Sequence, residues 1–250
     1  MIGNLEICDM SLGPDHWWSW LWWAKLYLDS RRALIVGMSL QLLHQFCGIG
    51  AVLYFTPQIL KQSGVDTLLI QAGIKANYAS LLASAVTCLP MLPFIVLEMF
   101  LMDRAGARQI LLSTTPVLFI TLLTIALVNK LLQPGIVQGG ISVVGLMVFF
   151  CAFNMGFGAV PNIFCSEIFP TRVRGVCLAL CVIVTWTTNM LIIFLFPTMN
   201  KALGTPGVFG FFCLMSAVSW IFIFLKVPET KGFPLEVITE FFAVSTSTDV

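Results

Sequence analysis

The chain has 250 residues, of which 58% are hydrophobic and 10% are charged, and its formal net charge at pH 7 is +1. A soluble domain carries about 25% charged residues, so this composition excludes an ordinary soluble protein and indicates an integral membrane protein. A net charge so near zero gives no indication of a nucleic-acid partner.

Residues 1–30 form an atypical tryptophan-rich segment, with five tryptophans between positions 17 and 23. The segment has neither the basic start nor the small-residue cleavage site of a signal peptide. One interpretation is an interfacial helix, because tryptophan favours the headgroup region. The other is an unusual start, such as an alternative exon or a gene-model error. In either case we expect the segment to be cytosolic.

Six apolar runs follow, each close to the roughly 20 residues that a helix needs to cross a hydrocarbon core of about 30 Å. Backbone amides exposed to lipid must bond within their own segment, so these runs must be helices. The sequence therefore predicts an all-α integral membrane protein, with a bundle of six transmembrane helices at 31–232 and a cytosolic C-terminal tail at 233–250. The predicted spans are 33–60, 78–102, 110–129, 141–164, 176–199 and 208–227.

Basic residues outside the spans set the predicted orientation. Six crossings place both termini on one side, which carries nine lysines and arginines from Lys25 to Lys231, against four on the other side. Because basic residues are retained in the cytosol, both termini and the loops after the second and fourth spans are predicted to be cytosolic.

The first and fourth spans share a pattern of small residues. The first has Gly48 and Gly50, and the fourth has Gly156 and Gly158 followed by Pro161. Proteins built from two three-helix repeats can place interrupted helices at matching positions around a site near the middle of the membrane. We therefore predict two interrupted helices around a hydrated cavity. Close helix packing through small residues is the alternative.

Polar and ionisable residues inside the spans are candidate functional groups. Pro90 and Pro93 should kink the second span. Glu98 lies about one turn from the cytosolic end of that span, and we expect it to snorkel to the headgroups or to reach Arg104. His44 lies about three turns into the first span. Both of its interpretations, a neutral packing histidine and a substrate or proton site, remain open.

In the fifth span, Trp186 and Asn189 are three residues apart and therefore share a helix face. An aromatic ring beside an amide suits a sugar, because the ring stacks on CH groups and the amide bonds hydroxyls. Tryptophan is also ordinary packing material, so this pair alone decides little.

The eight cysteines form no CxxC pair and no Cys/His spacing typical of a metal site, so we interpret them as small apolar residues. The sequence also lacks a recognisable nucleophile–base pair, metal cluster or phosphate loop. We therefore expect neither an enzyme nor a metal or cofactor.

Four stretches carry a family resemblance: QLLHQFCGIGAVLYFTP at 41–57, DRAGAR at 103–108, SEIFPTRVRG at 166–175 and VPETKG at 227–232. Together they resemble motifs of the sugar porter family of the major facilitator superfamily. The first is similar to the family motif Q-x-x-Q-Q-x-x-G-x-N-x-x-x-Y-Y. The resemblance covers about residues 31–244, and within the family the chain looks most like the plant tonoplast monosaccharide transporters.

The resemblance implies the C-terminal half of a major facilitator fold of twelve helices. The N-terminal half would come from a missing segment or from a second transporter chain. It also implies a hexose transporter that works by alternating access in the vacuolar (tonoplast) membrane, proton-coupled in its full-length form. The alternative is a truncated isoform that does not transport and acts as a binding or regulatory partner of a full-length sugar transporter.

By the same resemblance, two sets of residues are functional. Expected hexose-binding positions are Gln41, His44, Gln45, Tyr54, Phe153, Asn162, Trp186 and Asn189. A cytosolic charge network, whose ion pairs would hold the two halves closed, comprises Asp103, Arg104, Arg108, Glu167, Arg172, Arg174, Glu229 and Lys231. The chain departs from the motif at three positions, where His44 replaces a glutamine, Gly50 an asparagine and Phe55 a tyrosine.

Overall fold

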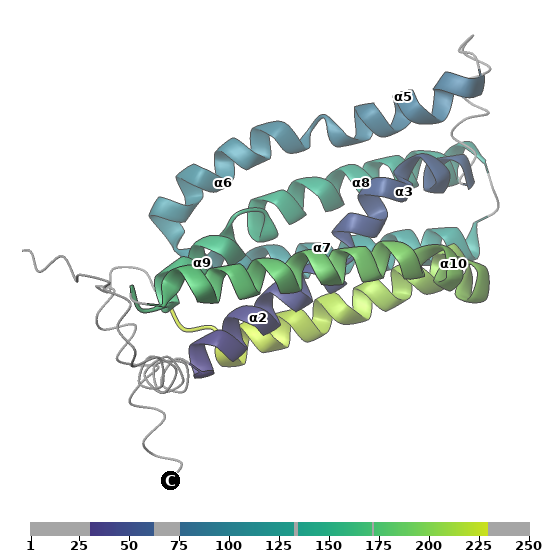
Figure 1. Ribbon diagram of the computed structural model, residues 1–250. Coiled ribbons are helices and arrows are strands. Elements are labelled where there is room, and N and C mark those ends of the chain that lie inside the picture. The colour runs from purple at the N-terminus through teal and green to yellow at the C-terminus, as the bar shows by residue number, and fades with distance from the viewer. Residues whose placement is uncertain (1–30, 63–75, 133–134, 172, 230–250) are drawn as a thin grey trace, which may run out of the picture.

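The computed structural model describes residues 31–62, 76–132, 135–171 and 173–229, so the tryptophan-rich segment and the C-terminal tail lie outside the described residues. Within these ranges every regular element is a helix (Figure 1). In chain order the helices are α2 (Arg31–Phe46), α3 (Ile49–Gln62), α5 (Ala76–Cys88), α6 (Met91–Ala105), α7 (Ala107–Leu131), α8 (Ile136–Phe157), α9 (Val160–Ile168) and α10 (Arg174–Lys226).

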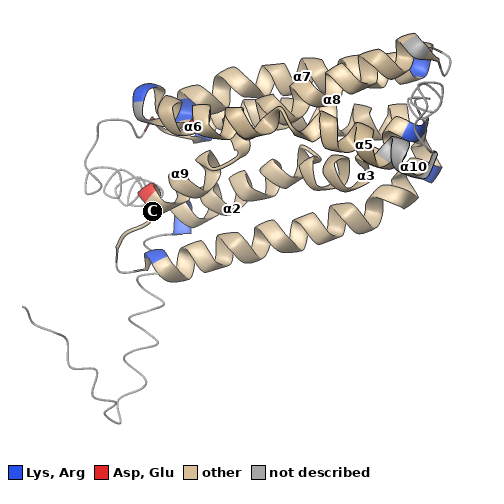
Figure 2. Ribbon diagram, turned by 90° about the horizontal axis from the view of Figure 1, so that it is seen from above, with Lys and Arg blue, Asp and Glu red and all other residues tan. Residues whose placement is uncertain are grey.

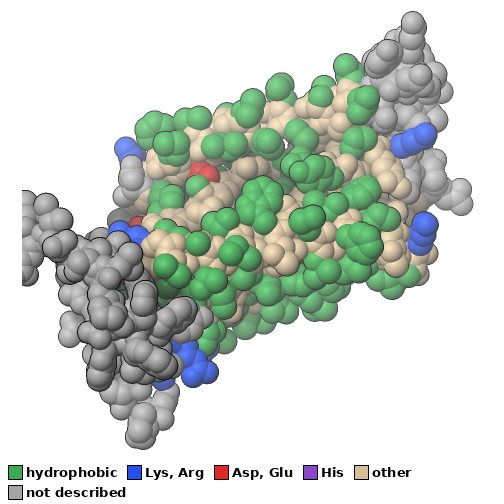
Figure 3. All heavy atoms as spheres, in the orientation of Figure 1, with side chains coloured by type: hydrophobic (Ala, Val, Ile, Leu, Met, Phe, Trp, Pro, Cys, Tyr) green, Lys and Arg blue, Asp and Glu red, His purple; other side chains and the backbone are tan. Residues whose placement is uncertain are grey.

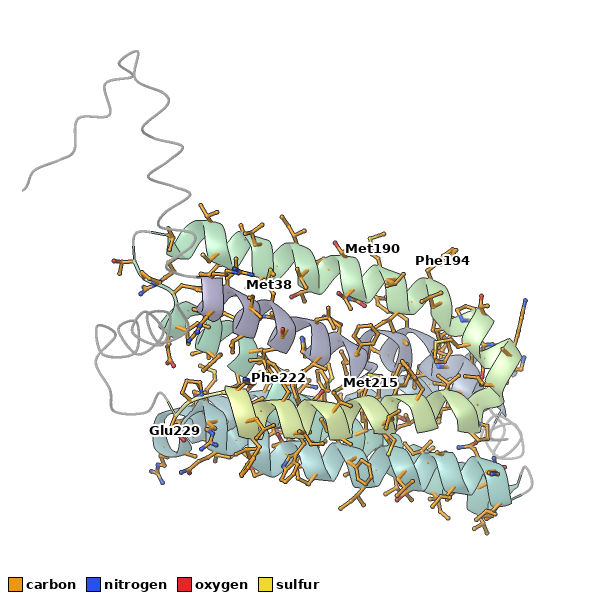
Figure 4. All side chains as sticks on the ribbon, turned by 90° about the horizontal axis from the view of Figure 1, so that it is seen from below. Met38, Met190, Phe194, Met215, Phe222 and Glu229 are labelled. Carbon is orange, nitrogen blue, oxygen red and sulfur yellow. The ribbon has the colours of Figure 1, made fainter. Side chains whose placement is uncertain are left out.

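The described helices form five stretches that are long and apolar enough to cross a membrane, and the last of them crosses twice. α10 has 53 residues and turns at Gly204, whose φ of 69° lies in the left-handed region that glycine adopts easily. Its two arms run antiparallel (Figures 1 and 4). The six predicted spans are therefore present, although the fourth covers 137–168 and not 141–164.

Three spans are interrupted where the sequence predicts a break or a kink. The first is divided between α2 and α3 at residues 47–48, the second between α5 and α6 at 89–90, and the fourth between α8 and α9 at 158–159. Gly48 has a φ of 89°, and a Cβ there would lie 2.6 Å from the Phe212 ring. Both the backbone conformation and the close contact therefore require glycine at this position.

The core of the bundle lies between α7, α8 and α10, and α2 packs against α10. Its largest fully buried side chains are phenylalanines: Phe149, Phe150, Phe157, Phe164, Phe169, Phe209 and Phe212. Lipid tails are as apolar as these side chains, so close packing between helices stabilises the bundle in place of the hydrophobic effect.

The outer surface matches a lipid environment along the length of the bundle. Figure 3 shows hydrophobic side chains covering the visible face, and Figure 2 shows lysine and arginine gathered at the two ends of the bundle. The first span, for example, begins at the exposed Arg31 and ends near the exposed Lys61. The basic residues therefore mark the two interfacial zones of a multi-pass membrane protein.

Candidate functional site

Gln41 joins three helices in the interior of the bundle. Its side chain is 0% exposed, and its Nε2 donates a hydrogen bond of 2.7 Å to Asn162 Oδ1 on α9. Its Oε1 accepts a hydrogen bond of 3.1 Å from Thr185 Oγ1 on α10. Each such bond contributes about 0.5–1.5 kcal/mol, so the amide fixes α2, α9 and α10 relative to one another.

The break in the fourth span is what brings Asn162 to Gln41. α8 ends at Phe157 and α9 begins at Val160, and α9 packs against α2. Asn162 lies in the first turn of α9 and is an exposed residue, while its Oδ1 accepts the hydrogen bond from the buried Gln41. The two interrupted spans therefore contact each other through Gln41 and Asn162, and the hydrated cavity between them stays a prediction.

His44 lies one turn beyond Gln41 and packs as an aromatic ring. It is stacked on Phe153 with ring centroids 5.2 Å apart and on Phe157 with centroids 5.9 Å apart. Its Nδ1 is buried and has no hydrogen-bond partner. The structure thus brings His44 and Phe153 together, with one ring nitrogen left for a donor or a proton.

Gln45 and Asn189 hold two unsatisfied amide oxygens. Gln45 follows Gln41 by one turn on α2, and Asn189 follows Thr185 by one turn on α10, in the same direction along two helices that pack together. Gln45 Oε1 and Asn189 Oδ1 are both buried without a hydrogen-bond partner. Buried hydrogen-bond acceptors normally have a donor, so the absence of a donor at these two oxygens requires an explanation.

Gly50 explains why Asn189 occupies its position. A Cβ built on Gly50 would collide with Asn189 Oδ1, so the amide of Asn189 fills the space in front of this glycine. The family motif has an asparagine at position 50. In this chain the amide facing that position comes from α10 instead of α3.

Tyr54 and Trp186 differ from the other expected site residues because they are 65% and 63% exposed. Trp186, Met190 and Phe194 follow one another at intervals of four residues on α10, and all three are exposed. Figure 4 shows Met190 and Phe194 pointing away from the bundle. Phe55, which replaces the second tyrosine of the motif, stacks on Phe196 with centroids 4.5 Å apart. The structure does not bring Tyr54 or Trp186 to Gln41.

Two residues near the site were missed or misassigned from the sequence. Thr185 was missed, although it lies four residues before Asn189 and therefore on the same helix face. The expectation that Glu98 reaches the headgroups or Arg104 is wrong. Glu98 is 3% exposed, and its Oε1 accepts hydrogen bonds from the backbone N–H of Ala159 at 2.7 Å and of Val160 at 3.2 Å.

At the end of the bundle with the predicted charge network, two arginines donate hydrogen bonds to backbone carbonyls. Arg108 Nη2 donates to Phe224 O at 3.0 Å, and its guanidinium lies 5.9 Å from the centre of the Phe224 ring. Arg174 Nε donates to Phe169 O at 3.3 Å. Glu167 Oε2 and Arg174 Nη2 are buried without a hydrogen-bond partner.

The ion pairs expected within that network stay a prediction. Arg104 and Glu229 both have interaction partners. The side chain of Asp103, and all of Arg172 and Lys231, lie outside the described residues.

The cysteines behave as small packing residues. All seven that the structure describes are free thiols, and four of them, Cys47, Cys165, Cys177 and Cys181, are at most 1% exposed. Cys165 and Cys181 both lie against Gly37, where a Cβ would be 3.3 and 3.5 Å from their sulfurs. They fill the contact between α2, α9 and α10.

Residues 9–242 match the family described as "Sugar (and other) transporter". The chain belongs to this family of the major facilitator superfamily. Its members are transporters and not enzymes, in agreement with the expectation from sequence.

Relatives with a curated description include three plant proteins. Monosaccharide-sensing protein 2 of Arabidopsis thaliana is 51% identical over 214 residues, which cover 86% of this chain and 29% of the relative. Monosaccharide-sensing protein 1 of the same plant is 47% identical over 223 residues, covering 89% and 30%. Polyol transporter 5 is 29% identical over 217 residues, covering 85% and 39%. The chain thus spans less than a third of the length of the two monosaccharide-sensing proteins.

Solved structures confirm the fold. The inward-open xylose transporter XylE of E. coli is similar with a TM-score of 0.70 at 24% sequence identity, over 92% of this chain and 47% of XylE. A D-xylose-proton symporter is similar with a TM-score of 0.66 at 25% identity, over 80% of this chain and 44% of that one. The bundle is therefore part of a major facilitator fold.

Proposed function

We propose that this chain forms one wall of a hexose-binding cavity in a transporter that works by alternating access. It would be the C-terminal half of the fold, with its termini in the cytosol, in the vacuolar membrane. The second wall would come from an N-terminal half or a second transporter chain, and the complete protein would couple hexose movement to protons. Family membership, the names of the monosaccharide-sensing relatives and the motifs shared with tonoplast transporters support this proposal.

One observation carries the proposal: two buried amide oxygens without partners lie one turn beyond the bonded set of Gln41, Asn162 and Thr185. An unsatisfied buried acceptor costs about 1–3 kcal/mol, which a hydroxyl donor would recover. A hexose presents several hydroxyls at short spacing. Gln45 and Asn189 are therefore assigned as hydroxyl acceptors, and Gln41 and Asn162 as the amides that complete the wall.

The exposed aromatic residues fit the same arrangement. Trp186 and Tyr54 both lie on the surface of the single chain. In a complete transporter they would face the second wall, where an exposed ring can stack on the CH face of a sugar. Phe153 and His44 would close the buried end of the cavity through their stacked rings.

A second candidate function is a truncated partner that binds a full-length sugar transporter and does not transport. The exposed stripe of Trp186, Met190 and Phe194 on one face of α10 favours it, because aromatic residues and methionine suit a protein contact. Both functions use the same face and differ in whether hexose crosses the membrane.

Hexose uptake separates the two functions. The chain is reconstituted in proteoliposomes alone and together with the N-terminal half of Monosaccharide-sensing protein 2, and labelled D-glucose is followed. We expect uptake with both halves, and a loss of about tenfold or more in Gln41→Ala, because losing 1.4 kcal/mol of binding is tenfold. Gln109→Ala is the matched control, since Gln109 is an exposed glutamine in the first turn of α7.

Two results would reject transport. The first is no uptake when the chain is assembled with an N-terminal half. The second is equal uptake by Gln41→Ala and by Gln109→Ala. Absent uptake together with tight binding to a full-length relative would support the regulatory function instead.

A further inference from the structure

We propose that Glu98 is a positioning residue, which fastens the break between α8 and α9 and thereby holds Asn162 within reach of Gln41. The carboxylate lies on α6, outside the set of residues assigned to hexose. Its effect on hexose binding rests on the proposed function, whereas its effect on α9 does not.

The hydrogen bonds of the break show what Glu98 supplies. The first N–H groups of a helix have no acceptor within the helix. Asn162 N is bonded to Ala159 O at 3.1 Å, and Pro161 has no N–H. The two remaining donors, Ala159 N and Val160 N, both bond Glu98 Oε1, at 2.7 and 3.2 Å. Glu98 therefore satisfies the start of α9 from another helix.

A negative charge on Glu98 would strengthen this contact. The N-terminus of a helix carries a partial positive charge, and a carboxylate beside it is stabilised. Bonds from backbone N–H to an ionised acceptor are stronger than neutral ones, most of all away from water. Glu98 is 3% exposed, so water does not compete for the same donors.

The absence of a side chain at Gly158 leaves space for the carboxylate of Glu98. A Cβ on Gly158 would lie 2.8 Å from Glu98 Oε2 and 2.6 Å from Asn154 O. Two residues earlier, a Cβ on Gly156 would collide with Thr114 Oγ1 of α7. Two glycines therefore let α6 and α7 approach the end of α8, which fixes the point where α9 starts.

The path from Glu98 to the site is short. Val160 is bonded to Glu98, and Asn162 follows two residues later in the first turn of a nine-residue helix. Asn162 Oδ1 accepts the bond from Gln41 Nε2. A shift of this first turn moves the side chain of Asn162 away from Gln41, so the carboxylate on α6 acts on the site through the backbone of α9.

The test uses the full chain in lipid nanodiscs, with Glu98→Ala, which removes both acceptor and charge, and Glu98→Gln, which keeps an oxygen acceptor. Thr87→Val is the matched control, because Thr87 is buried in the same span and its hydroxyl donates a hydrogen bond to the backbone carbonyl of Ala83 in its own helix. Hydrogen exchange of the peptide covering 158–163 is the first readout. We expect exchange at least tenfold faster in Glu98→Ala, partial rescue in Glu98→Gln and no change in Thr87→Val.

The second readout separates positioning from a merely structural role. Asn162→Ala is made in the wild-type and in the Glu98→Ala background, and the shift in melting temperature is compared. If Glu98 positions Asn162, the shift caused by Asn162→Ala is at least halved when Glu98 is already absent. Equal shifts in both backgrounds, or unchanged exchange at 158–163, would overturn the proposal.

Hexose binding to the same variants, measured in the assembly with an N-terminal half, forms the third arm. A weaker affinity in Glu98→Ala that Glu98→Gln restores supports the role in the site, and an unchanged affinity rejects it. Wild-type protein that binds no hexose, while the two readouts above behave as expected, would reject the proposed function and leave the role of Glu98 in α9 established.

Discussion

The two interrupted spans that approach the site are broken in different ways. Between α2 and α3 the break depends on one residue, Gly48, whose positive φ and contact with the Phe212 ring exclude a side chain. Between α8 and α9 the break depends on Glu98, a carboxylate 61 residues earlier in the chain. One break is encoded locally by backbone conformation, and the other by a hydrogen bond from a distant helix.

Substitution of Gly48 should have the largest effect. Gly48→Ala places a Cβ on a left-handed backbone and 2.6 Å from the Phe212 ring. We expect a loss of about 2–5 kcal/mol from the sum of backbone strain and overpacking, seen as a lower melting temperature in detergent. Gly140→Ala is the control, because a Cβ there meets nothing within 4 Å. A melting temperature no lower than that of the control would show that the first break does not depend on glycine.

Gly158→Ala tests the second break and should cost less. The new Cβ would lie 2.6 Å from Asn154 O and 2.8 Å from the movable carboxylate of Glu98. We expect a loss of about 1–3 kcal/mol in unfolding free energy, with faster hydrogen exchange over 158–163. Gly210→Ala, also at an open position, should leave both measurements unchanged. Destabilisation without a change in exchange at 158–163 would contradict a role for Gly158 in admitting Glu98.

Gly50→Ala should affect hexose binding more than stability. Its Cβ would displace the amide of Asn189, and since that side chain can rotate, the loss of stability should be only about 1 kcal/mol. We expect a roughly tenfold weaker hexose affinity, because the Cβ displaces the amide that is assigned as a hydroxyl acceptor. The double variant with Asn189→Ala measures the coupling. If Gly50→Ala weakens binding equally with and without Asn189, the assigned contact is wrong.

His44→Phe should have the smallest effect. Phenylalanine keeps the stacking on Phe153 and Phe157 and removes a buried nitrogen that lacks a partner. We expect a change of less than about 1 kcal/mol in stability. Uptake by the assembled transporter then decides between the two interpretations of His44. Unchanged uptake assigns it to packing, and a loss of pH-dependent uptake assigns it to proton or substrate binding.

The spans and the positions of their breaks could be predicted from the sequence, because apolar runs, glycines and prolines are local signals. Apolar length gives the crossings, and Gly48, Pro90 and Gly158 lie at or beside the three interruptions. The role of Glu98 could not be predicted. Snorkelling is inferred from the position of a residue along its own helix. The role of Glu98 as a hydrogen-bond acceptor depends instead on which helix packs beside α6. The periodicity of a sequence predicts which face of a helix a residue occupies, but it does not predict which other helix packs against that face.

In the candidate site, too, some features could be predicted from the sequence and others depend on how the helices pack. Gln41 and Asn162 were assigned by resemblance, and the structure places them in contact. Thr185 belongs to no sequence motif. Its hydrogen bond to Gln41 depends on the packing of α2 against α10 and is found only in the structure. By comparison with the family motif, Gly50 lacks the amide of an asparagine. The structure shows an amide from another helix in front of that glycine, which a linear motif cannot reveal.

The most direct test of the account is equilibrium binding of labelled D-glucose to the chain assembled with an N-terminal half, compared with Gln45→Ala and Asn189→Ala. The account predicts saturable binding that unlabelled D-glucose displaces and L-glucose does not, and an affinity at least about tenfold lower in each variant, because each removes one buried hydroxyl acceptor. Equal affinity in the wild type and both variants would contradict it.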